Sequence, residues 1–185
     1  MKRGKKIVVV AHCYLNQNAR VQPYASRQGV FKELINPLIE HGFGLIQLPC
    51  PESTACGLNR WEAVTEQYDN PAFRRHCRTI LQPFVDQFVN HQKAGDRIYA
   101  VLGVPFSPCC GTKHNPSNKN WGGPLLSGRV VPELKIVDGP AVFMQELISL
   151  CEEASIKISF MDISETEDIF PELQPQNVLK QILEE

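Results

Sequence analysis

The chain has 185 residues, of which 43% are hydrophobic and 21% charged, as is typical of a globular protein of one domain. A formal net charge of −1 argues against a strongly basic surface that would bind nucleic acid polymers or anionic membranes. The basic residues 2–6 are followed only by the short apolar run 7–11, so we expect no secretory signal and no membrane span, and a cytoplasmic location.

Buried strands and amphipathic helices alternate along the predicted chain. The run KKIVVVA at 5–11 is typical of a strand buried on both faces, and Asn70 with Pro71 is a typical helix start. Strands are predicted at 5–11, 43–48, 98–104 and 156–163, and helices at 29–41, 71–94, 140–154 and 174–184. This order indicates right-handed crossovers and a mostly parallel sheet covered on both faces.

We therefore expect a single α/β domain over residues 1–185, with a three-layer, Rossmann-like or flavodoxin-like architecture. A glycine-rich insert follows the third strand, and its segment NWGGPLLSGR at 120–129 is predicted to form a hairpin or lid. Neither a GxGxxG fingerprint nor a P-loop pattern occurs, which disfavours a dinucleotide or P-loop nucleotide site.

The seven cysteines are the main chemical signal. Their odd number and the expected cytoplasmic location favour metal binding or catalysis over a disulfide framework. Cys13 follows the first predicted strand, Cys50 the second, and the adjacent pair Cys109 and Cys110 the third. Ligands of open α/β sheets bind outside the carboxyl ends of the strands, so we expect these thiols to meet at one edge of the sheet.

The other three cysteines have different interpretations. Cys77 and Cys151 lie on the apolar stripes of predicted helices, where a cysteine is usually a small buried hydrophobe. Cys56 is equally credible as a spare thiol, a ligand or a neutral residue.

Two kinds of metal site suit the cysteines at the strand ends. Three thiolates from three loops can hold a [4Fe–4S] cluster and leave one iron open for substrate. Zinc is the alternative, with water or one of His12, His76 and His114 as the fourth ligand. A disulfide between Cys109 and Cys110 would require a strained ring.

The cysteine motifs resemble those of the family typified by the thiouracil desulfidases. AHCYLN resembles that family's small-residue-Cys-aliphatic start, LPCPESTACGL its Cys-Pro-Glu turn, and FSPCCG its Ser-Pro-Ser-Cys-Gly. A later run at 137–163 resembles its glycine-led helix and final strand. The resemblance covers residues 7 to about 163, which implies a desulfidase-like core at about 5–165 followed by the helix at 174–184. Segments 16–29 and 114–129 differ from the corresponding segments of the family. The family also has two adjacent glycines after Pro-Glu, and this chain has only Gly57 there.

This resemblance implies that Cys13, Cys50 and Cys110 hold the cluster. Cys109 stands where the family has serine, and side chains of neighbouring residues in extended backbone point to opposite faces. We therefore expect Cys110 to be the ligand and Cys109 to face outward or to stand behind the ligand.

The resemblance further implies a reaction without net redox chemistry. Sulfur is removed from a small thiocarbonyl compound such as a thiolated nucleobase, C=S becomes C=O by attack of water, and sulfide is released. Glu52 is the candidate acid/base, with a solvated turn carboxylate as the alternative. Ser107 is the candidate donor to the substrate or to a cluster sulfur, with a plain turn serine as the alternative.

Several neighbouring residues are weaker candidates. Asn16, Asn18 and Arg20 suit the amide-like edges of a substrate, with a solvated loop as the alternative. Lys113 and His114 suit the steering of an anionic substrate.

Two other functions stay open. The protein could be a zinc or thiol-redox protein, or a non-catalytic module that binds a cluster or a ligand.

Overall fold

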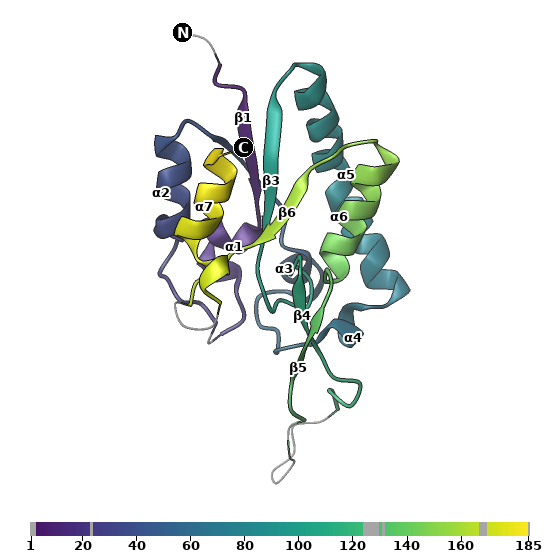
Figure 1. The fold of residues 1–185 in the computed structure, drawn as a ribbon. Helices are drawn as coiled ribbons and strands as arrows, with labels where there is room; N and C mark the ends of the chain where they lie inside the picture. The colour runs from purple at the N-terminus through teal and green to yellow at the C-terminus, as the bar shows by residue number, and fades with distance from the viewer. Residues whose placement is uncertain (1–2, 23, 124–129, 131, 167–169, 185) are drawn as a thin grey trace.

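The computed structural model describes residues 3–22, 24–123, 130, 132–166 and 170–184. A parallel sheet of four strands forms its centre, in the order β2-β1-β3-β6 (Figure 1). The strands are β1 (Lys6–Val10), β2 (Gly44–Gln47), β3 (Arg97–Gly103) and β6 (Ser159–Asp162). The predicted α/β class with a parallel sheet is confirmed.

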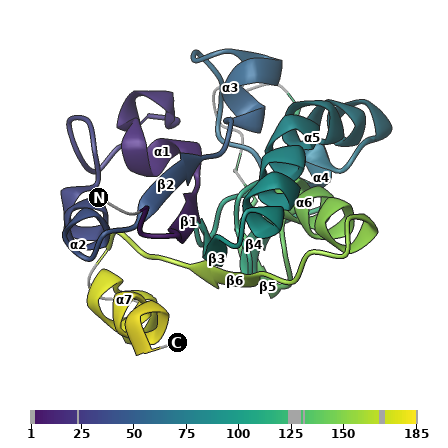
Figure 2. The ribbon, with the colours of Figure 1, turned by 90° about the horizontal axis from the view of Figure 1, so that it is seen from above.

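Helices cover both faces of this sheet, as the view from above shows (Figure 2). α2 (Lys32–Glu40) and α7 (Pro175–Glu184) lie on one side, and α5 (Pro71–Lys93) and α6 (Val142–Glu153) lie on the other. Shorter elements lie near the carboxyl ends of the strands: α1 (His12–Leu15), α3 (Pro51–Cys56), α4 (Thr65–Tyr68) and 3-10 turns at Gln17–Ala19 and Pro171–Leu173. No helix in the described residues is long and apolar enough to cross a membrane.

The side chains of β1 divide the core into two layers. Val8 and Val10 pack with α2 and α7, whereas Ile7 and Val9 pack with α5 and α6. Successive side chains of a strand point to opposite faces, so an unbroken apolar run is what a strand between two helical layers requires.

An antiparallel ribbon extends beyond the carboxyl edge of the sheet (Figure 1). It pairs β4 (His114–Ser117) with β5 (Lys135–Asp138), and in the sequence the predicted hairpin or lid at 120–129 falls between these two strands. Residues 124–129 of that segment lie outside the described residues.

The last strand is shorter than the predicted range 156–163. Ile156 is buried among the residues of α5 and α6, and its amide donates to the carbonyl of Cys151 at the end of α6. Ser155 before it has a φ of 57°, which ends the helix in a left-handed turn. Ile156 is therefore apolar because it packs under a helix end, and only Ser159–Asp162 pair with β3.

Gly103, at the end of β3, permits the close packing of the cysteine turn. A Cβ atom there would lie 2.4 Å from Thr112 Cγ2 and 2.5 Å from the carbonyl oxygen of Cys110. We expect Gly103→Ala to lower the free energy of unfolding by about 1–3 kcal/mol, because one of these groups must move. Urea denaturation measures the loss. The matched control is Gly29→Ala, where the added atom meets nothing within 4 Å; equal losses in the two variants would contradict this explanation.

Candidate functional site

A pocket of about 420 Å³ lies at the carboxyl edge of the sheet. Cys13, Cys50, Cys109 and Cys110 all line it, although they come from three separate loops. The candidate residues Glu52 and Ser107 line it as well. The fold therefore brings Cys13, Cys50, Cys110, Glu52 and Ser107, the predicted site residues, to one place, at the edge where open α/β sheets bind their ligands.

Local structure places the first two thiols. Cys13 lies in α1, immediately after β1, and is partly buried. Cys50 is the N-cap residue of α3, and its Sγ accepts a hydrogen bond from the Ser53 amide at 3.4 Å. Pro51 stands at the first position of that helix, where a missing amide hydrogen costs nothing.

The electrostatics link the three predicted ligands. Burial raises the pKa of Cys13 to about 12, with a further increase from Cys110 and an opposing effect of Arg20. Burial likewise raises the pKa of Cys50, and Cys110 again adds to the increase. Cys110 is thus close enough to act on both other thiols. Near neutral pH Cys13 and Cys50 are protonated, so a metal that binds them must displace their protons.

Of the two alternatives predicted for Cys109, the outward-facing one is wrong. It is 2% exposed and lines the pocket, and its Sγ lies 3.4 Å from that of Cys110. The prediction assumed extended backbone, but residues 108–110 form a turn, in which neighbouring side chains can point to the same side. The Cys109 carbonyl also accepts from the amides of Phe143 and Met144 at the start of α6, which fixes this turn.

Glu52 is a buried carboxylate and not a solvated one. It is 7% exposed, and its Oε2 accepts a hydrogen bond from Arg60 Nε at 2.6 Å. Its Oε1 accepts from the thiol of Cys109 at 2.8 Å. Arg60 also donates to the carbonyl of Ala19 at 2.7 Å. Burial lowers the pKa of Arg60, but the hydrogen bond and charge of Glu52 outweigh it and raise that pKa.

Ser107 holds the cysteine turn. Its Oγ accepts from the amides of Cys109 and Cys110, at 3.4 and 3.0 Å, and lies 3.5 Å from Cys109 Sγ. These contacts are those of a turn serine. Because Ser107 also lines the pocket, its hydroxyl hydrogen can point either to Cys109 Sγ or to a bound molecule.

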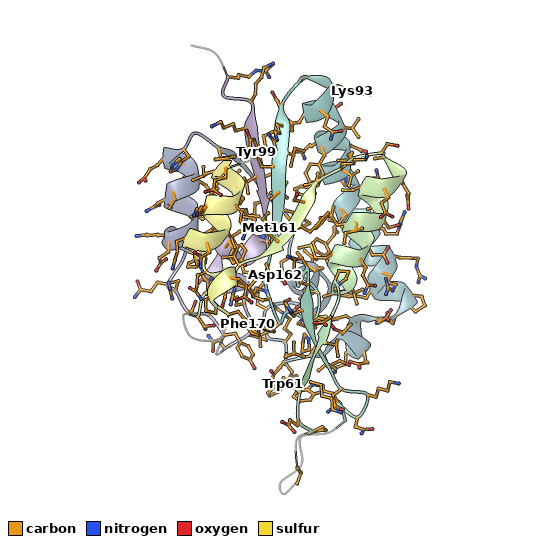
Figure 3. All side chains as sticks on the ribbon, in the orientation of Figure 1. Trp61, Lys93, Tyr99, Met161, Asp162 and Phe170 are labelled. Carbon is orange, nitrogen blue, oxygen red and sulfur yellow. The ribbon has the colours of Figure 1, made fainter. Side chains whose placement is uncertain are left out.

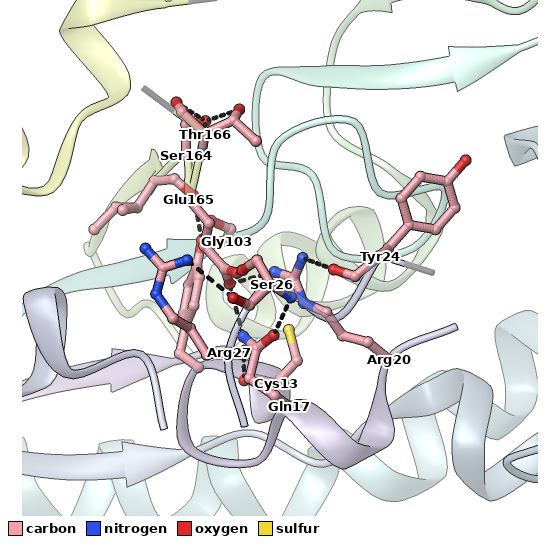
Figure 4. A network of polar contacts seen from close by, with 12 residues as sticks. Cys13, Gln17, Arg20, Tyr24, Ser26, Arg27, Gly103, Ser164, Glu165 and Thr166 are labelled. Atoms are coloured by element: carbon pink, nitrogen blue, oxygen red, sulfur yellow. Dashed lines mark hydrogen bonds and ion pairs between the residues drawn. The ribbon is translucent and has the colours of Figure 1, made fainter. Parts of the chain in front are cut away.

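A polar network beside Cys13 also lines the pocket (Figure 4). Glu165 is its centre: Oε1 accepts from Gln17 Nε2 at 2.9 Å and from Arg20, and Oε2 accepts from Ser26. Arg20 also donates to the carbonyl of Tyr24 at 3.2 Å. Sequence reasoning missed Glu165, because nothing in the sequence relates this residue after the last strand to the loop after the first.

Asp162 is a second residue that sequence reasoning missed. It ends β6 (Figure 3), is 1% exposed, and accepts hydrogen bonds from the amides of Thr112 and Lys113 at 2.7 and 2.9 Å. It therefore ties the segment after Cys110 to the edge of the sheet. The signal was present, since an acidic residue inside the apolar run SFMDI is unusual unless it is hydrogen bonded.

Several of the other candidates lie away from the pocket. Cys77 and Cys151 are buried in the core beside α5 and α6, and Cys56 is exposed at the end of α3. Asn16 and Asn18 hydrogen bond to each other and are not pocket residues, in contrast to Arg20. Lys113 and His114 do not line the pocket either, and His114 stacks on Phe170.

The thiols of the pocket come from three separate loops. Within the described ranges, no group of three or more His, Cys, Asp and Glu side chains is arranged to hold one metal ion. The cysteines that bind a cubane cluster lie farther apart than the ligands of one metal ion, because each cysteine binds a different iron. The pocket offers three such thiols from three separate loops, those of Cys13, Cys50 and Cys110.

The fold and the pocket together define a class: an α/β protein with four thiols and a buried Glu-Arg pair at the carboxyl edge of a parallel sheet. Over 108 residues the chain is 32% identical to the uncharacterized protein MJ0003 of Methanocaldococcus jannaschii, a match that covers 58% of this chain and 69% of that protein. The chain belongs to the same family as MJ0003. No family model and no solved structure matches the chain.

Proposed function

We propose that this protein is a [4Fe–4S]-dependent desulfidase that converts the C=S group of a small compound to C=O without net redox chemistry. One observation carries the proposal: Cys13, Cys50 and Cys110 line one pocket together with the buried carboxylate of Glu52. The resemblance of the three cysteine motifs to the thiouracil desulfidases supports the same reaction.

Cys13, Cys50 and Cys110 would hold the cluster. When bound, such a cluster supplies an open iron, a soft Lewis acid that binds the substrate sulfur and polarises the adjacent carbon. Water provides the oxygen of the product; one of its hydrogens leaves with the sulfur as hydrosulfide, and the other is released as a proton. The protein must therefore move one proton from the attacking water toward the departing sulfur.

Glu52 is placed to carry that proton. The 2.6 Å hydrogen bond from Arg60 fixes Oε2 of Glu52, so Oε1 is the atom that can accept a proton. The thiol of Cys109 donates to this same Oε1 and holds it toward the pocket. Ser107 lines the same wall and offers a hydroxyl hydrogen to the substrate.

Purification without oxygen tests the proposal. We expect a brown protein with broad visible absorption, about equal amounts of iron and acid-labile sulfide after reconstitution, and sulfide release from a thioamide or from thiouracil. A colourless protein that binds no iron on reconstitution would contradict the proposal of a cluster-dependent desulfidase. Stoichiometric zinc without labile sulfide, or a reversible two-electron titration of thiols without iron, would instead identify the zinc or thiol-redox alternative.

A further inference from the structure

We propose that the substrate is an uncharged thiocarbonyl compound with an apolar aryl or alkyl substituent, which lies against the β4–β5 ribbon while the C=S group faces the cysteines. This inference rests on the proposed function and names its substrate class. It is carried by the composition of the pocket wall and by the pairing of its charges.

The pocket has a polar end and an apolar end. The polar end carries the thiols, Glu52 and the Glu165 network at the edge of the sheet. The apolar end is completed by Pro116 and Ile136, which are partners across the ribbon beyond that edge (Figure 1). Other apolar residues line the same pocket, namely Val21, Ala63, Phe106 and Leu134.

The exposure of Ile136 indicates that the apolar end binds an apolar group of the substrate. It is 48% exposed although it is a large aliphatic residue, and its exposed side chain borders the pocket. A substituent placed there would remove this side chain from water, and that burial is favourable. A substrate without such a substituent leaves this wall unused.

Both arginines among the described pocket residues are already paired with carboxylates, and the third carboxylate there, Glu62, accepts a hydrogen bond from Tyr24. Arg60 is bound to Glu52 and Arg20 to Glu165, and all four side chains are at most 15% exposed. An anionic substrate would find both arginines of the pocket already bound to carboxylates, and its desolvation would be poorly compensated.

The size of the pocket agrees with a substituted substrate. Its volume of about 420 Å³ falls in the range of roughly 300–1,000 Å³ that small-molecule sites occupy. A single pyrimidine ring fills only part of such a space. The apolar wall and the paired charges together favour a thioamide or thiourea with an apolar group over a bare or phosphorylated nucleobase.

Equilibrium binding to the reconstituted full-length protein tests this inference. Isothermal titration under nitrogen compares thiobenzamide with thiouracil and thiouridine monophosphate, and compares their oxygen analogues benzamide and uracil, which cannot be turned over. We expect both benzamides to bind at least tenfold more tightly than the pyrimidines, and the nucleotide to bind most weakly. Ile136→Lys should weaken binding of benzamide at least tenfold.

Val137→Lys is the matched control, because Val137 is the next residue of β5, is 39% exposed and does not line the pocket. The inference is overturned if none of the compounds binds, if the pyrimidines or the nucleotide bind as tightly as benzamide, or if the two lysine variants behave alike. The two proposals fail separately. Tight benzamide binding without sulfide release from thiobenzamide would refute the desulfidase and leave the pocket preference standing.

Discussion

Replacement of Cys110 by alanine should abolish cluster binding, with at least a tenfold fall in iron and labile sulfide per chain after reconstitution. The reason is that this thiol would be one of three ligands, and nothing else in the described pocket wall offers a third thiolate except its neighbour Cys109. Visible absorption and iron content measure the loss. Cys13→Ala and Cys50→Ala should behave in the same way.

The decisive control is Cys109→Ala, which removes the adjacent thiol and should retain iron. Cys77→Ala and Cys151→Ala should also retain it, because these cysteines lie in the core beside helices. Circular dichroism separates loss of the cluster from loss of the fold. Iron retained by Cys110→Ala but lost by Cys109→Ala would reverse the ligand assignment, since both thiols line the pocket 3.4 Å apart.

Glu52→Gln should lower the kcat for sulfide release by about 100- to 10,000-fold, which is the usual contribution of a positioned acid/base group. The amide keeps the shape of the side chain but cannot accept the proton. The same change should lower the free energy of unfolding by about 3–5 kcal/mol, because it leaves the buried charge of Arg60 without its counter-ion. Steady-state kinetics and urea denaturation measure the two effects.

A double variant separates the two roles of Glu52. Glu52→Gln combined with Arg60→Met removes the unpaired charge, so stability should recover while kcat stays low. Glu153→Gln serves as the control, since its side chain is 55% exposed and paired with Arg78 on the surface, far from the pocket wall. Recovery of kcat in the double variant would show that Glu52 acts only by supporting the fold.

Much of the architecture follows from local patterns in the sequence. The valine run of β1 is apolar on both faces because helices cover both faces of the sheet. Asn70 caps α5 by accepting from the Phe73 amide at 3.0 Å, as the Asn-Pro start predicts. The placement of Cys13, Cys50 and Cys110 at one edge follows from strand order alone, because parallel strands share their carboxyl end.

The tertiary structure decided how the residues of the pocket are paired. Periodicity reports which face of a helix or strand is buried, but it carries no information on the path of a loop or on partners distant in sequence. The turn that aims Cys109 at Glu52, the ion pair of Glu52 with Arg60, and the link from Glu165 to Arg20 all depend on such loops. The sequence by itself thus determined which thiols converge, whereas the folded loops determined that they converge beside a buried carboxylate paired with an arginine.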